Sequence, residues 1–417
     1  MPSRLRSLYR AYPAQFWLLF WGLLISTTGA SMIWPFLMIY VSERLSLPLA
    51  VVSSLMVVNS AAGLVFSFVA GPLADRVGRK GVMTASLILN GVVYLFQSHA
   101  NTLPAFALLI GLSGAVNPLY RVGADAMLAD LVPQEKRPEA YSLLRMSNNV
   151  GVALGPLAGG LIAATSYSLA FYLAAGGMIL YGILVLLLGR ETLVKGPAQA
   201  AQVLQGGEAG SRSGRKTGLD GYGRVLRDRP FISFTGAFTL TYISAAIMWV
   251  LLSVYTKENF GIQENRFGLI PMTNAIMVVL FQYPVTRAFK RLHPLWTMAA
   301  GSLFYALGVG SVGLGQGFWM FWGSMVVMTL GELALVPTGA TYAAELAPAH
   351  MRGRYMSIYN LTWGLAVGVG PVLGGLLNDH LGPRFIWWGA GIIALLGALV
   401  FGLLASRSRR ALEVELI

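Results

Sequence analysis

The sequence contains no cysteine and little charge. The absence of cysteine from its 417 residues excludes disulfide bonds and thiol chemistry. Charged residues make up 11% of the chain, whereas a soluble domain carries about 25%. No Gly-x-x-x-x-Gly-Lys-Ser/Thr run is present, so the chain has no loop of the kind that ATP-driven motors use. The four histidines are scattered, and we predict no metal site, no cofactor and no enzymatic activity.

Apolar residues dominate instead. They make up 56% of the chain, and the mean hydropathy is +0.64. Apolar runs of about 20 residues or more, long enough to cross a bilayer, recur along the chain. We predict an all-α membrane protein with twelve transmembrane helices, at residues 14–41, 49–71, 81–99, 103–129, 139–163, 169–189, 230–256, 266–287, 294–314, 318–345, 354–378 and 384–405.

The positive charge is distributed unevenly between the two sides of these spans. A net charge of +13 would suggest nucleic-acid binding in a soluble protein. Here 24 of the 30 Lys and Arg residues fall in segments on one predicted side, which the positive-inside rule assigns to the cytoplasm. We therefore expect no nucleic-acid partner, both termini in the cytoplasm and a location in the cell (inner) membrane.

The most informative short loop follows the second span. Residues 71–80 read Gly-Pro-Leu-Ala-Asp-Arg-Val-Gly-Arg-Lys, which places one acid, three bases and two glycines between two apolar runs. Asp75 is suited to cap a helix of the other bundle, because a carboxylate accepts hydrogen bonds from the free N–H groups of a first helical turn. Arg79 is expected to reach a carboxylate of the next hairpin, with Asp130 as the candidate partner.

This spacing resembles motif A of the major facilitator superfamily. The matching residues are Gly71, Asp75, Arg76, Gly78, Arg79 and Lys80. The resemblance implies two six-helix bundles that rock about a central site, with this loop in a gating network that includes Asp130 and Arg145. A generic basic loop is the alternative interpretation.

The two halves of the chain repeat each other. Ala129-Asp130-Leu131-Val132-Pro133 matches Ala344-Glu345-Leu346-Ala347-Pro348, and Gly155-Pro156-x-x-Gly159-Gly160 matches Gly370-Pro371-x-x-Gly374-Gly375, both at an offset of 215 residues. We predict a duplicated pair of bundles, at residues 1–189 and 230–417, as in transporters built from repeats. A cytoplasmic linker rich in Gly, Ser, Gln and Arg at residues 190–229 joins them.

The glycine-rich run of span five supports two interpretations. Gly151, Gly155, Pro156, Gly159 and Gly160 resemble motif C, which in this superfamily is associated with proton-coupled antiporters. Small residues also allow two membrane helices to pack closely, and span eleven carries the same pattern. Close helix packing is therefore the alternative to an antiporter signature.

Spans four and five carry charges that are costly in a membrane. Arg121 and Asp125 are four residues apart, so they share a helix face and are expected to pair. Such residues normally face a bundle interior or a water-filled cavity, which favours proton coupling or substrate binding. A structural charge cluster is the alternative, above all for Asp130 and Arg145. The superfamily's usual motif B arginine is absent, because Ile110 stands at its position.

Span ten carries Glu332 near its middle, with no base nearby in the sequence. An acid in this setting can take up and release protons near neutral pH. Gly331-Glu332-Leu333 resembles the helix-ten acid of multidrug efflux antiporters of the superfamily, which implies a role in drug or proton binding. The alternative is a glutamic acid that stays protonated.

Aromatic residues occur on the helices expected to line a cavity. Their rings suit apolar or cationic compounds, although Trp and Tyr also form belts at membrane interfaces. The candidates are Trp34, Phe36, Tyr40, Tyr242, Trp249, Tyr359 and Trp363.

Together these features predict a monomeric, proton-driven exporter of apolar or cationic drug-like compounds that works by alternating access. Its expected partners are the lipid bilayer, a small-molecule substrate and protons. Export of an endogenous metabolite, sugar or lipid is one alternative. A receptor or scaffold that no longer transports is another.

Overall fold

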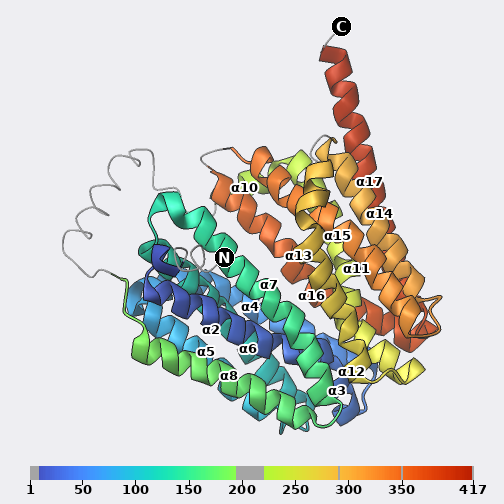
Figure 1. The fold of residues 1–417 in the computed structure, drawn as a ribbon. Helices are drawn as coiled ribbons and strands as arrows, with labels where there is room; N and C mark the ends of the chain where they lie inside the picture. The colour runs from blue at the N-terminus through green and yellow to red at the C-terminus, as the bar shows by residue number, and fades with distance from the viewer. Residues whose placement is uncertain (1–8, 194–219, 290–291, 349–350, 416–417) are drawn as a thin grey trace.

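The computed structural model describes residues 9–193, 220–289, 292–348 and 351–415, and these residues form helices and connecting loops without a strand. The first set of elements is α2 (Ala14–Ile33), η1 (Trp34–Phe36), α3 (Leu37–Leu45), α4 (Leu49–Val77), α5 (Arg79–Gln97), α6 (Leu103–Leu131), η2 (Gln134–Lys136), α7 (Arg137–Ala163) and α8 (Tyr167–Leu188). The second set is α10 (Asp220–Arg227), α11 (Arg229–Phe260), α12 (Glu264–Phe267), α13 (Leu269–Phe289), α14 (Pro294–Val312), α15 (Phe318–Leu346), α16 (Arg352–Leu381) and α17 (Phe385–Glu415) (Figure 1).

Helices occupy all twelve predicted span positions in the described part of the chain, but only ten are long and apolar enough to cross a membrane by length and composition. α5 is not among the ten, and its polar residues, among them Arg79, Lys80 and Gln97, lower its mean hydropathy. α7 is not among them either, since its charged first third is followed by Asn148, Asn149 and several glycines, which keep the mean hydropathy low. The number twelve therefore stays a prediction, whereas the all-helical, multi-pass membrane architecture is confirmed.

Local sequence explains where several helices begin. Thr102, Ser166 and Asp228 precede α6, α8 and α11, and each side chain accepts a hydrogen bond from a backbone N–H of the first turn. Proline follows at the first or second position of α6, α7, α11 and α14, where its missing N–H has no intrahelical partner to lose.

The helices pack mainly within two sets, α2–α8 and α11–α17, which we call the N-terminal and C-terminal halves. Within them α2 packs on α7, α4 on α6, α5 on α8, α14 on α15 and α17, and α11 on α16. The pairs that cross between the halves include α4 with α16, α7 with α13 and α12, and α3 with α11. The division at residues 190–229 stays a prediction, because residues 194–219 lie outside the described ranges.

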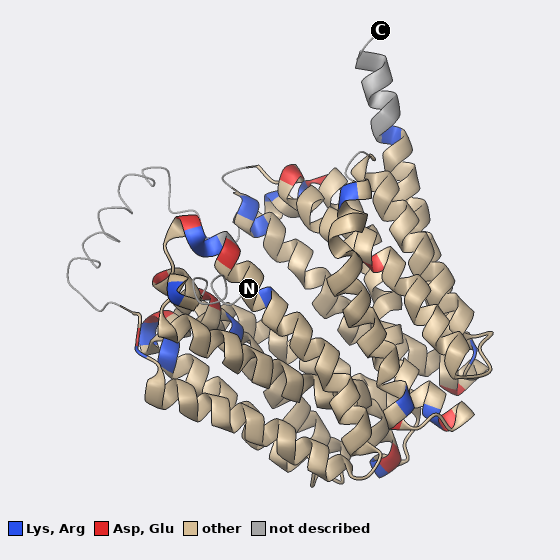
Figure 2. Cartoon of the chain, in the orientation of Figure 1, with Lys and Arg blue, Asp and Glu red and all other residues tan. Residues whose placement is uncertain are grey.

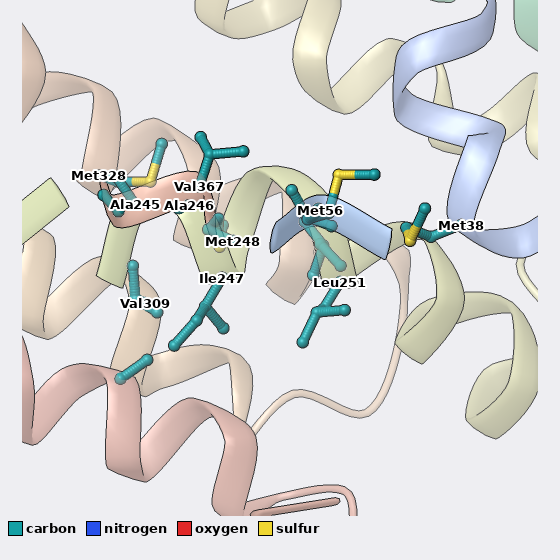
Figure 3. Close-up of a cluster of buried hydrophobic side chains, with 14 of the residues drawn as sticks. Met38, Met56, Ala245, Ala246, Ile247, Met248, Leu251, Val309, Met328 and Val367 are labelled. Atoms are coloured by element: carbon teal, nitrogen blue, oxygen red, sulfur yellow. The ribbon is translucent and has the colours of Figure 1, made fainter. Parts of the chain in front are cut away.

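The two halves are joined toward one end of the bundle, which we call the Lys257 end. We call the opposite end, where most Lys and Arg residues gather, the basic end (Figure 2). A buried apolar cluster crosses between the halves at the Lys257 end, where Met38 and Met56 pack with Met248, Leu251 and Val367 (Figure 3). Among the described residues, every hydrogen bond and ion pair between the halves also lies there.

Toward the basic end the halves are not held together in this way. A second buried cluster there contains only residues of the N-terminal half, including Phe16, Met83 and Tyr181. The basic-end part of α4 is largely exposed, with Phe68 at 66% and Val77 at 55%. The described structure is thus closed at the Lys257 end and open at the basic end.

Candidate functional site

The loop that resembles motif A joins α4 to α5 in a sharp turn. α4 ends at Val77, and Gly78 adopts φ 107° and ψ 152°, a region that only glycine enters readily. α5 begins immediately at Arg79. The glycine therefore allows two long helices to meet with one residue between them, which brings the side chains of both helix ends together.

Arg79 is the centre of an ion-pair network at this turn. Its Nε lies 3.2 Å from Oδ2 of Asp130, at the end of α6, and its Nη2 lies 3.4 Å from Oδ1 of Asp75. The hydroxyl of Thr192 also donates to Oδ2 of Asp130, at 2.8 Å. Arg79 thus reaches the carboxylate predicted for it and ties three helix ends together.

Glu191, which we did not predict as a site residue, completes this network. It follows α8, and its carboxylate accepts hydrogen bonds from four backbone N–H groups, those of Arg79, Lys80, Thr192 and Leu193, at 2.9–3.1 Å. Partial burial opposes ionisation, but these four donors outweigh it and lower the pKa of Glu191. The only signal in the sequence was an isolated acid directly after span six.

Asp75 and Arg145 do not make the contacts expected of them. Asp75 is 70% exposed, and within the described ranges it makes no hydrogen bond to a helix of the C-terminal half, because the halves are apart at the basic end. Arg145 is exposed on α7 and forms no ion pair with Asp130 in the described structure, so its predicted place in the network is wrong for this conformation. Arg76 is also exposed, and Lys80 is half-buried.

The glycines of α7 form a close contact with α2. A Cβ atom added to Gly151 would lie 2.9 Å from Cβ of Thr27, and one added to Gly159 would lie 2.8 Å from Cα of Met32. Gly155 meets Ser31 between them. These three residues are spaced by four, so they share one helix face. Helix packing, the alternative interpretation of this run, accounts for them.

The neighbouring positions of the same run contact the other half. Gly160 abuts the backbone of Glu264, and the carbonyl of Pro156 faces Gly268. The repeat in α16 behaves in the same way, since Gly370 and Gly374 pack on α11 and Gly375 packs on the start of α4. The offset of 215 also relates the two cross-half partners, Leu49 and Glu264, so the duplicated sequence builds two equivalent interfaces.

The charged pair of α6 does not form as predicted. Arg121 and Asp125 are both exposed on α6, and no ion pair within 4.0 Å joins them in the described structure. Asn117, also exposed, precedes them at the same spacing of four. The three side chains therefore form a polar stripe on one face of α6, and Tyr141 of α7 donates to the Asp125 carbonyl oxygen at 3.3 Å.

Glu332 lies in the C-terminal half with a defined polar partner. Nδ2 of Asn274, on α13, donates to Oε2 of Glu332 at 2.7 Å and to the hydroxyl of Thr329 at 2.9 Å. Asn274 and Thr329 are buried, and Glu332 is half-buried. The arrangement holds a carboxylate, an amide and a hydroxyl together between α13 and α15, a set that can bind a cation or exchange a proton.

Three of the predicted aromatic residues, on α11 and α16, lie together in the same half as this acid. The ring centroids of Tyr242 and Trp363 are 5.2 Å apart. Phe238 contacts Tyr242 edge-on at 4.6 Å and Tyr359 at a tilt at 5.1 Å. Tyr242 lies in the neighbourhood of Glu332. We call Glu332, Asn274, Tyr242, Tyr359 and Trp363 the acid–aromatic cluster.

The other predicted aromatic residues do not join this cluster. Phe36 and Tyr40 are buried core residues near the Lys257 end, where Tyr40 packs on Phe106 and Phe171 and donates its hydroxyl to the Ser98 carbonyl at 2.7 Å. Tyr40 lines the pocket at the Lys257 end instead, and a place for these two residues in a substrate cavity stays a prediction. Trp34 and Trp249 are half-buried against the same apolar core.

A polar group closes the Lys257 end and was also missed from the sequence. Lys257 of α11 forms ion pairs with Glu43 of α3 and Glu264 of α12, and Tyr167 of α8 donates to Glu264. These residues line a pocket of about 470 Å³ together with Arg44. Because Glu43 and Tyr167 belong to one half and Lys257 and Glu264 to the other, the group ties the halves together.

Comparison with known proteins identifies the family. A family model described as Major Facilitator Superfamily matches residues 19–250 and again residues 234–415. The chain belongs to this superfamily. The two matches together cover most of the chain, and each contains one of the duplicated Gly-Pro-x-x-Gly-Gly runs.

The similar members of the superfamily are transporters whose names indicate different substrates. A Na(+), Li(+), K(+)/H(+) antiporter of Planococcus maritimus is 27% identical over 375 residues, which cover 84% of this chain and 86% of that protein. Multidrug resistance protein MdtH of Escherichia coli O9:H4 (strain HS) is 26% identical over 351 residues, 82% of each chain. The crystal structure of a POT family transporter in complex with a thioalcohol-conjugated peptide superposes with a TM-score of 0.75 at 18% identity, covering 95% of this chain and 99% of that one. The protein is thus a multi-pass membrane transporter of the superfamily type.

Proposed function

We propose that this transporter exports apolar, cationic drug-like compounds across the cell membrane in exchange for protons, with both termini in the cytoplasm. The observation that carries the proposal is the acid–aromatic cluster. The Tyr and Trp rings offer an apolar surface with negative ring faces, and the Glu332 carboxylate can neutralise a bound positive charge. The name of the MdtH relative supports this substrate class.

The coupling follows from competition for one carboxylate. A cationic compound binds the ionised form of Glu332, whereas a proton removes that charge and so weakens the attraction. Asn274 donates a hydrogen bond to Oε2 of Glu332 and so holds the carboxyl group in a fixed position between α13 and α15. Substrate and proton then occupy Glu332 in turn, the substrate while the site faces one side of the membrane and the proton while it faces the other.

The membrane potential can supply enough free energy for useful export. One elementary charge that crosses about 100 mV gains roughly 2.3 kcal/mol. Because about 1.4 kcal/mol corresponds to a factor of ten, this supports a concentration ratio of roughly fifty. A pH gradient would add to it.

The decisive experiment is substrate-induced proton release from purified protein. We expect the parent to release protons when a cationic compound binds and Glu332→Gln to release none, because glutamine resembles the protonated acid and cannot give up a proton. Glu345→Gln is the matched control, since it makes the same change at an exposed position of the same helix. Equal proton release by parent and Glu332→Gln would exclude Glu332 as the coupling acid and make Asp125 the next candidate.

Exchange of alkali cations for protons is a second candidate function. The side-chain oxygens of Glu332 and Thr329 both lie within hydrogen-bond distance of Nδ2 of Asn274, and hard cations prefer oxygen ligands such as carboxylates. The name of the Planococcus maritimus relative points to the same activity for that protein.

Proteoliposomes with a trapped pH dye distinguish the two functions. A pH change on addition of Na⁺, Li⁺ or K⁺ alone favours the second, and a change only with organic cations favours the first. A response to sugars or lipids instead would favour export of an endogenous metabolite.

A further inference from the structure

A second copy of the motif A pattern lies at the opposite end of the bundle. Residues 375–384, Gly-Leu-Leu-Asn-Asp-His-Leu-Gly-Pro-Arg, follow the pattern of residues 71–80. The offset is 304 at every match, which pairs Gly71 with Gly375, Leu73 with Leu377, Asp75 with Asp379, Gly78 with Gly382 and Lys80 with Arg384. This offset differs from the repeat offset of 215, so duplication of the halves does not produce the match.

The two loops share their backbone geometry as well. Asp75 stands two residues before the end of α4, and Asp379 stands two residues before the end of α16. Each helix then stops at a glycine in the same unusual region, Gly78 at φ 107° and ψ 152° and Gly382 at φ 109° and ψ 165°. The helices α4 and α16 pack against each other and run in opposite directions, so each aspartate stands at the end of the bundle where the partner helix begins.

Asp379 caps the partner helix in this structure. Its Oδ1 accepts from the backbone N–H of Leu49 at 3.2 Å, and its Oδ2 accepts from that of Ala50 at 2.9 Å. Pro48, which precedes α4, provides no side-chain cap of its own. Gly375 permits the approach, because a Cβ atom there would lie 2.5 Å from Cα of Ala50. A carboxylate of one half therefore stabilises the first turn of a helix in the other half.

The reciprocal contact is open at the basic end. Asp75 is 70% exposed, and α16 begins after Met351, which provides no side-chain cap either. The two helices thus have the same requirement at their starts, and among the described residues a side chain of the other half meets it only at the start of α4.

We propose that residues 375–384 form a second gating loop and that the two aspartates act in turn. Asp379 caps α4 while the Lys257 end is closed, and Asp75 caps α16 while the basic end is closed. Each cap forms as the other breaks, because rocking of the halves separates one pair of helix ends as it joins the other. The exchange leaves one helix start capped in each state, which keeps the two states close in free energy. The inference rests on the alternating-access part of the proposed function and is independent of the substrate.

Introduced cysteines can test this directly, since the chain has none of its own. Ser53→Cys is a reporter for the Lys257 end, because Ser53 is buried on α4 in the closed region, and Ser67→Cys is a reporter for the exposed basic-end part of α4. The measurement is the rate at which a thiol reagent labels each reporter cysteine in the full-length protein without substrate. We expect Asp379→Ala to raise this rate roughly tenfold at the Ser53 reporter and to lower it at the Ser67 reporter. The factor is the one expected for loss of a typical helix cap. Asp379→Asn should give a smaller effect, since its amide keeps one acceptor oxygen.

Two further variants keep the test decisive. Asp75→Asn should shift both labelling rates in the opposite direction to Asp379→Ala, and His380→Ala, an exposed neighbour, should leave them unchanged. If Asp379→Ala fails to fold, Gly375→Ala provides the second measurement, because its added methyl group pushes α16 away from Ala50 while Asp379 remains. Parent-level labelling of the Ser53 reporter in both Asp379→Ala and Gly375→Ala would overturn the proposal. The proton-release experiment above can fail or succeed independently of this result.

Discussion

The contact between α7 and α2 gives the sharpest prediction for a single substitution. A methyl group at Gly159 would lie 2.8 Å from Cα and 2.9 Å from the carbonyl carbon of Met32. Both are backbone atoms, so no change of rotamer relieves the clash. Since ordinary contacts begin near 3.4 Å, the helices must separate by roughly 0.5–1 Å, and overpacking of this kind costs about 1–3 kcal/mol.

Gly176 on α8 provides the matched control, because a Cβ atom there meets nothing within 4 Å. Alanine is the better helix former by about 1 kcal/mol, so Gly176→Ala should be neutral or slightly stabilising. We therefore expect Gly159→Ala to lower the melting temperature of the purified protein by a few degrees and Gly176→Ala to leave it unchanged or raise it. Gly159→Leu should reduce expression or transport further.

The assay is thermal unfolding in detergent together with transport in proteoliposomes, with parent and both alanine variants at equal protein concentration. If Gly159→Ala unfolds and transports as the parent does, then the α2–α7 contact is not the close packing described here. The same result would favour the other interpretation of the glycine run, as an antiporter signature that has no role in helix packing.

Three further outcomes are expected. Arg79→Ala and Asp130→Asn should each raise the labelling rate of a basic-end cysteine or lower the transport rate, because each removes one partner of the ion pair. The double variant should change these rates no more than either single variant does, and additive effects would show that the two residues do not act as a pair. Folding lowers the pKa of Glu191, so its carboxylate stabilises the folded protein above the ordinary carboxyl pKa of 4.5, and this stability is lost as the pH falls through the lowered value. The unfolding temperature of Glu191→Gln should therefore depend less on pH in the acid range than that of the parent. Parallel curves for the two proteins would contradict this. Lys257→Met should open the Lys257 end, measured as faster labelling there, because it leaves the buried Glu264 without its ion-pair partner; an unchanged rate would exclude Lys257 as a latch.

Much of the fold follows from one-dimensional patterns. Apolar runs, basic loops and the offset of 215 between Gly155 and Gly370 predict helices, sides and duplication, because hydrocarbon tolerates only segments whose backbone is satisfied internally. The resemblance of residues 71–80 to motif A gave the family, which the comparisons confirm.

The conformation and the contacts between halves needed three dimensions. Asp75 was expected to cap a helix and does not, whereas Asp379 caps one and was not expected to, since the sequence carries both loops and cannot say which end is closed. Arg121 and Asp125 share a face, but a shared face does not force the side chains within 4.0 Å of each other.

The sequence by itself therefore determined that this protein is an all-helical membrane transporter of its superfamily, because span length, charge asymmetry and loop spacing are properties of the chain. Only the tertiary structure decided which side chains meet. Glu191 reaches the start of α5 from 112 residues away, Asn274 reaches Glu332 from another helix, and Lys257 bridges two halves. Such contacts depend on how helices pack, and no local pattern along the chain records which residues that packing brings within hydrogen-bonding distance.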